Sequence, residues 1–121
     1  MAYTGIMCTL LEFQYKAGLN ASSTTISEAY ANSFVGQAES YVNVKTLYNW
    51  SDAFASLNVD VKGILTEVVS NLAAIYAISA QMSGFTSRQE ALIMCNILWA
   101  RVETCCQLLE TEANRTFVKE A

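Results

Sequence analysis

The sequence contains no proline and no histidine, and only 15% of its 121 residues are charged. At average usage a chain of this length would contain about six prolines. Because proline ends helices, its absence allows long uninterrupted helices. The absence of histidine removes the most common general base and the most common metal ligand. Ordinary soluble domains carry roughly 25% charged residues, so this chain is apolar for its size.

Sequence signatures of catalysis and of nucleotide binding are also absent. The chain has no HExxH, no GxxxxGK[ST] and no GxSxG, and its five glycines stand apart from one another. Glu110 and Glu112 are two positions apart on a predicted helix, so their carboxylates do not face each other. The sequence therefore predicts a protein that is not an enzyme and that holds no cofactor or metal ion.

The cysteines and the basic residues form no recognisable cluster. Cys8, Cys95, Cys105 and Cys106 include no CxxC pair, and the sequence shows no secretory leader. We therefore expect reduced thiols in a cytosolic setting. The net charge is −4 and the seven lysines and arginines are scattered, so the sequence does not predict a tight nucleic-acid-binding surface.

Apolar spacing predicts an all-α fold, a small bundle of three main helices. We expect these helices at residues 27–47, 59–83 and 87–111, with a short helical turn in the stretch YNWSDAFASLN between the first two. Apolar residues of the third helix line one side: Ala91, Met94, Cys95, Leu98, Val102, Cys105 and Leu109. A bundle of this size forms one domain.

Local signals place the helix ends. The sequences TISE at residues 25–28 and SRQE at residues 87–90 fit the capping box. Asn58 is placed to cap the middle helix, and Gly84 is placed to end it.

Outside the helical domain at residues 26–112, both ends are expected to be extended. We expect an N-terminal arm at residues 1–25, with a short strand or helical turn near residues 10–16. A loose polar tail is expected at residues 113–121.

The run VVSNLAAIYAISAQMSGFTS at residues 68–87 contains no charged residue. Its several polar residues and the lack of flanking basic clusters argue against a membrane span. A helix that is apolar on all sides needs neighbours on all sides, and the other two main helices cover two of them. We therefore interpret this helix as shared between the core and a subunit interface; an ordinary core helix is the alternative. The predicted interface residues are Leu72, Ala73, Ile75, Tyr76, Ala77 and Ala80.

Three segments of the chain resemble the head-to-tail connector, or adaptor, family of tailed bacteriophages. They are QAESYVNVKTLYNWSDAFASLN, DVKGILTEVVSNLAAIYAISAQMSGFTSRQEA and NILWARVE. The resemblance covers residues 13–109 and lies in helix lengths, aromatic placement and the YNW and SGFTSR stretches. It implies a structural virion protein of the neck, between capsid and tail, that is made in the cytoplasm of a bacterial host.

The resemblance also implies partners. Family members form a homo-oligomeric ring, commonly a dodecamer, that joins the portal protein to tail or neck proteins without a membrane. DNA passes through the channel without sequence-specific binding, which the negative net charge suits. The family uses terminal segments to grip the portal, and here these correspond to Phe117, Val118 and Lys119.

Other classes of protein stay open at this point. A small terminase-like protein also forms rings, but it calls for a helix-turn-helix and a basic surface. Other neck or tail completion proteins are often rich in β-structure. A helical oligomeric interaction protein of a host cell would pair through the same charge-poor helix, and its expected size is a dimer rather than a ring.

Overall fold

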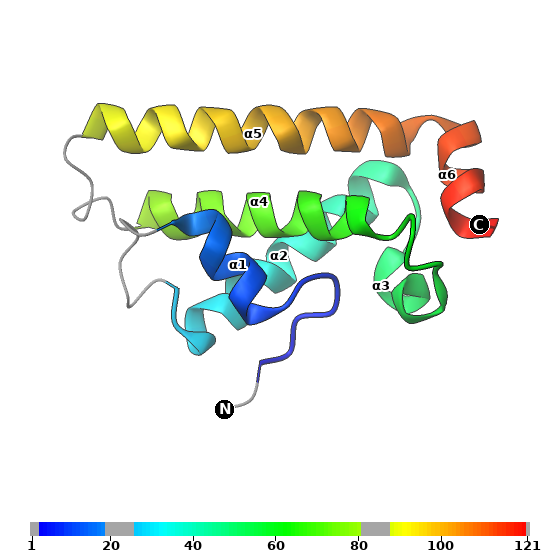
Figure 1. Cartoon of the computed structure of the whole chain (residues 1–121), viewed down its shortest axis with the longest axis horizontal. Coiled ribbons are helices and arrows are strands. Elements are labelled where there is room, and N and C mark those ends of the chain that lie inside the picture. Colours follow the sequence, from blue (N-terminus) through cyan, green and yellow to red (C-terminus); the bar gives the residue numbers. More distant parts are fainter. Residues whose placement is uncertain (1–2, 19–25, 81–87, 121) are drawn as a thin grey trace.

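The computed structural model describes residues 3–18, 26–80 and 88–120. All regular structure in these residues is helical, which confirms the predicted all-α class (Figure 1). The elements are α1 (Leu10–Ala17), α2 (Glu28–Thr46), α3 (Trp50–Ala53), the 3-10 turn η1 (Phe54–Ser56), α4 (Gly63–Ala80), α5 (Arg88–Glu110) and α6 (Glu112–Glu120).

The central helix of the bundle is α4, which contacts α1, α2 and α5. Figure 1 shows α5 running alongside α4, with α1 in front of α4 and α2 behind it. Because three helices surround α4, its charge-free stretch from Val68 to Ala80 can be packed inside a single chain.

The side of α4 toward the N-terminal segment is made of small residues. Thr66, Ser70, Ala73 and Ala77 recur at spacings of four, three and four, so they share one face of the helix. The Thr66 hydroxyl donates a hydrogen bond to the Met7 carbonyl oxygen at 2.6 Å, which identifies this face as the one toward α1. Small side chains here let α1 approach closely.

The other two sides of α4 carry larger residues. Tyr76 packs its ring 6.2 Å from Phe34 of α2, and Leu65, Val69 and Leu72 share the face of Tyr76. The third side of α4 faces α5, where a separate buried cluster forms from Ala74, Ile78, Ala91, Cys95 and Leu98, together with Ala17 of α1.

The helical alternative expected near residues 10–16 is confirmed, but the expectation of an extended arm is wrong for this stretch, because residues 10–17 form the two-turn helix α1 and belong to the core. Thr9 and Glu12 form a capping box: the Glu12 N–H donates to Thr9 Oγ1 at 3.1 Å, and the Thr9 N–H donates to Glu12 Oε1 at 2.7 Å. Phe13 is fully buried. The helix ends at Gly18, whose φ of 84° favours glycine.

The residues before α1 are tied to α2 by a buried carboxylate. Glu39 Oε2 accepts hydrogen bonds from the main-chain N–H groups of Ile6 and Met7, both at 2.7 Å. Glu39 is 6% exposed, and the Met7 side chain is fully buried. A carboxylate that accepts two main-chain N–H groups fixes the path of the chain here.

An ion pair joins α1 to α4. Lys16 Nζ lies 2.7 Å from Glu67 Oε2, and the Asn71 side-chain amide donates to Glu67 Oε1 at 2.9 Å. The hydrogen bond from Lys16 is the main cause that holds the pKa of Glu67 below its ordinary value, and the Asn71 amide adds to it.

This pair leads to a prediction on pH dependence. The variant Lys16→Gln is expected to lose less than about 1 kcal/mol of unfolding free energy at neutral pH, because both side chains are partly exposed. A carboxylate with a lowered folded-state pKa stabilises the fold above its ordinary pKa of 4.5, and this contribution disappears as pH falls through the folded-state value. The difference between wild type and variant in urea unfolding should therefore vanish well below pH 4.5. An unchanged difference in acid would contradict the assignment.

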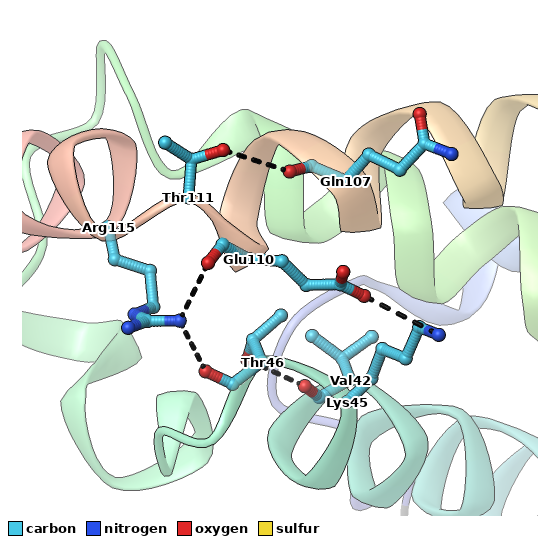
Figure 2. Close-up of polar contacts among 7 residues, drawn as sticks. All are labelled: Val42, Lys45, Thr46, Gln107, Glu110, Thr111 and Arg115. Carbon is cyan, nitrogen blue, oxygen red and sulfur yellow. Dashed lines mark hydrogen bonds and ion pairs between the residues drawn. The ribbon is translucent and has the colours of Figure 1, made fainter.

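The expectation of a loose tail is also wrong, since residues 112–120 form α6. Val118 is buried against the core. Arg115 connects the ends of α2 and α5, because its Nη1 donates to the carbonyl oxygens of Thr46 at 3.0 Å and of Glu110 at 3.1 Å (Figure 2). In the same view, Lys45 Nζ lies 3.5 Å from Glu110 Oε1.

The predicted helix ends agree only in part with the structure. The N-cap of α2 is Ser27, but its side chain makes no capping bond. The helix expected from residue 59 begins at Gly63; residues 59–62 form a turn, where Asn58 Oδ1 accepts the Asp60 N–H at 2.8 Å. Residues 25, 81–84 and 87, used for the other predicted ends, lie outside the described residues.

Candidate interaction surface

The inner face of α5 is largely the one that the sequence predicts. Ala91, Cys95, Leu98, Val102 and Leu109 are buried against the other helices. Of the remaining two, Met94 and Cys105 are half-buried, and Cys106 is buried beside them. The apolar repeat of this helix therefore identified its core side.

The opposite side of α5 is also apolar. Ile93, Ile97, Ala100, Thr104 and Leu108 recur at spacings of four, three, four and four, and all five are exposed. We call this set the outer α5 face. Ile93 and Ile97 are 51% and 53% exposed. Figure 1 shows no described element on the side of α5 away from α4, so the described part of the chain leaves this face uncovered.

Charge is absent from the first half of the outer α5 face. No charged residue occurs from Ala91 to Ala100, and the first charges after it are Arg101 and Glu103. By length and composition alone both α4 and α5 could cross a membrane, a pattern that core helices of soluble proteins share. The two differ in burial: 56% of the most apolar window of α4 is buried, but only 28% of that of α5.

A second apolar area lies between α2 and α5. It contains two groups of contacting rings, Tyr30 with Phe34 and Tyr76, and Tyr41 with Trp99, which we together call the aromatic surface. Ring centres are 5.8 Å apart in the pair Tyr30 and Phe34, and 6.2 Å apart in the pairs Phe34 with Tyr76 and Tyr41 with Trp99. Burial raises the pKa of Tyr76, and the neighbouring Tyr41 adds to the shift.

The aromatic surface has the composition of a protein interface. Tyrosine and tryptophan are enriched at the centres of such interfaces because each ring contributes a large apolar area together with a polar group. All five residues of the aromatic surface remain partly exposed, Tyr30 at 44% and Trp99 at 37%. An exposed apolar surface of this kind is a candidate interaction site.

The total accessible area of the chain shows that these apolar side chains are not exposed because of an extended or loosely packed shape. It is 6574 Å², close to the roughly 6500 Å² expected for a compact monomer of this mass. The chain is therefore compact, and what is unusual is which residues lie on its surface. Thirteen large apolar side chains are exposed among the described residues, and five of them are on α5.

The predicted interface on α4 needs correction. Of the six predicted residues, Leu72, Ala73 and Ala77 are buried within the chain itself, Ile75 and Tyr76 are half-buried, and Ala80 is exposed. Two helices were expected to cover α4, but α1 packs on it as a third. Of this set, Tyr76 does contribute to the aromatic surface.

The three residues predicted to dock on the portal point in different directions on α6. Val118 is buried, whereas Phe117 is 65% exposed. Lys119 lies with its Nζ 4.7 Å from the ring centre of Tyr48. Phe117 lines an apolar hollow of about 250 Å³ between α4, α5 and α6, beside Leu108 of the outer α5 face. Of the three, only Phe117 and Lys119 are accessible to a partner.

The outer α5 face was missed in the sequence, although a signal for it exists. Leu92, Ile93, Ile97 and Trp99 do not fall on the predicted core side of the third helix. Large apolar residues outside the core stripe of an amphipathic helix indicate a second contact. The charge-free run at residues 68–80 is instead largely buried within the chain.

The thiols of Cys8 and Cys106 lie in apolar surroundings inside the chain. Burial is the main cause that raises the pKa of Cys8 and of Cys106 to about 11, so both thiols are protonated at neutral pH. Among the described residues no group of three acidic or thiol side chains could hold a metal ion.

The chain matches no protein-family model. Searches of curated proteins and of solved structures also found no significant match. The uncovered apolar areas are therefore the features from which a function has to be argued.

Proposed function

We propose that this protein is a structural virion subunit, a head-to-tail connector that forms a ring beneath the portal and joins the capsid to the tail. The observation that carries this proposal is the uncovered outer α5 face together with the adjoining aromatic surface. In the proposed assembly, neighbouring copies and the portal, tail or neck proteins cover these areas.

The size of the uncovered areas supports an assembly role. A stable interface buries about 800 Å² on each partner. The outer α5 face runs from Ile93 to Leu108, which is about 22 Å at 1.5 Å per residue. A ring subunit hides two flanks against identical copies, and this explains why a compact chain keeps so many apolar side chains at its surface.

The basic residues support a passive role toward DNA. Lys16 and Lys45 form ion pairs, Lys62 and Lys119 lie over aromatic rings, and Arg115 binds main-chain carbonyl oxygens. These contacts within the chain leave few cations to bind phosphates, and phosphate contacts supply most non-specific affinity for DNA. DNA then passes through the proposed ring without being held.

The variant Ile97→Glu tests whether the outer α5 face is buried on assembly. Ile97 is 53% exposed, so the subunit should fold normally, but a buried unpaired carboxylate in an interface costs several kcal/mol. We expect at least about 100-fold weaker incorporation into portal-bearing particles, which corresponds to about 2.7 kcal/mol. The measurement is co-sedimentation of purified subunit with particles, followed by electron microscopy of the neck.

A matched control is Val59→Glu, which places the same charge at a 76% exposed apolar residue in the turn before α4. This variant should be incorporated like wild type. Equal incorporation of Ile97→Glu would contradict burial of the outer α5 face, and wild-type protein that never joins the particle would overturn the connector role. A stable dimer as the final state would favour the alternative, a helical oligomeric interaction protein, and a gel shift with duplex DNA would favour a small terminase-like protein.

A further inference from the structure

A third apolar patch lies on the N-terminal segment, remote from the aromatic surface. Leu11 and Tyr15 are one helical turn apart on α1 and are 53% and 71% exposed; Ile6, just before the helix, is 48% exposed. We call these three residues the outer α1 face. The other side of α1 holds the fully buried Phe13, so this short helix is apolar both toward the core and toward solvent.

The arrangement of helices places the outer α1 face and the aromatic surface on opposite sides of α4. At roughly 100° per residue, the face of α4 toward α1 is about 90° to 100° from the faces toward α2 and α5, and the widest gap, about 170°, lies between α2 and α5. The Tyr41 ring of α2 and the Trp99 ring of α5 meet across this gap, 6.2 Å apart, and Tyr76 lies at its edge on the α2 side of α4. Because α1 packs on the side of α4 between the sides facing α2 and α5, the wide gap between α2 and α5 is on the far side of α4 from α1.

We propose that neighbouring copies pack head to tail, with the outer α1 face of one copy against the aromatic surface of the next. This inference rests on the proposed function, because it names the contact between copies within the proposed ring. A ring closes through unlike surfaces on each subunit, so that every copy presents one and receives the other. Two apolar patches on opposite sides of one compact subunit meet this requirement.

The sizes of the two patches fit such a contact. An aromatic side chain buries about 150 to 250 Å², so five partly exposed rings supply several hundred Å², the order of the 800 Å² or so that each partner of a standard interface buries. On the other patch, Leu11 and Tyr15 project as a pair at positions i and i+4, the spacing by which helix ridges fit into grooves. The outer α5 face is then left for the portal or tail.

A mixing experiment tests the pairing of unlike surfaces. One variant combines Leu11→Glu with Tyr15→Glu, and the other combines Tyr30→Glu with Trp99→Glu. Each variant keeps one intact patch, so each alone should be monomeric by native mass spectrometry at high concentration, whereas wild type self-associates. A mixture should form a one-to-one dimer of twice the 13.3 kDa chain mass and nothing larger, since its remaining surfaces are both blocked.

Circular dichroism verifies that each variant is folded, and Tyr30→Glu alone replaces the double variant if Trp99→Glu unfolds. A mixture with no dimer, or variants that still associate by themselves, would overturn the pairing. Wild-type protein that stays monomeric would overturn it as well. The connector role is judged separately by incorporation of wild type into portal-bearing particles, so failure of the pairing leaves that result unaffected.

Discussion

Replacement of Phe13 by alanine should lower the free energy of unfolding by about 3 to 5 kcal/mol. Phe13 is fully buried in the main core cluster, where α1 packs on α4. Its removal leaves a cavity that the small residues on this side of α4 cannot fill. Because a domain of this size is stable by about 5 to 15 kcal/mol, the urea midpoint followed by circular dichroism should fall sharply.

The matched control is Leu11→Ala on the same helix. Leu11 is 53% exposed, so its truncation should change the unfolding free energy of the subunit by less than about 1 kcal/mol. If Phe13→Ala and Leu11→Ala had equal midpoints, α1 would not be part of the core, and the assignment of α1 as the third neighbour of α4 would be lost.

Removal of the Glu39 carboxylate by Glu39→Ala should cost about 2 to 4 kcal/mol of unfolding free energy. The carboxylate accepts the N–H groups of Ile6 and Met7 at 2.7 Å each. Without the carboxylate, the buried Met7 N–H loses the acceptor that Glu39 provides. An unsatisfied buried donor costs about 1 to 3 kcal/mol. Urea unfolding at neutral pH measures the loss.

Two further substitutions separate this role from a general effect on α2. Glu39→Gln keeps one oxygen that can accept a hydrogen bond, so its loss should be smaller than that of Glu39→Ala. Ser40→Ala changes the exposed neighbouring position and should be close to neutral. Faster hydrogen exchange at the Ile6 and Met7 amides should accompany the Glu39 variants only; unchanged exchange would argue against the contact.

The surplus of apolar surface that the composition indicates is present, but on another helix. The low charge content led to α4, because its sequence has the longest charge-free run. The chain covers α4 with α1, α2 and α5, and it leaves the outer face of α5 and the aromatic surface exposed. An assembly role thus remains the best-supported proposal, with a different contact surface.

Local features of the sequence determined the helical class, the positions of α2 and α5 within a few residues, and the buried side of α5. These properties depend on the 3.6-residue repeat, which adjacent residues set by themselves. The same local rule could have identified α1, since TLLE at residues 9–12 is a capping box of the type used for the other helices.

Only the tertiary structure decided which side of each helix meets which neighbour. Glu39 finds Ile6 and Met7 more than thirty residues away, Arg115 reaches Thr46 across 69 positions, and α1 covers the small residues of α4. Such contacts depend on how the helices are arranged in space, and no periodicity within one segment encodes that arrangement. The sequence therefore indicated an excess of apolar area, and the packing of α1, α2 and α5 around α4 decided that this excess lies away from α4, with its largest share on α5.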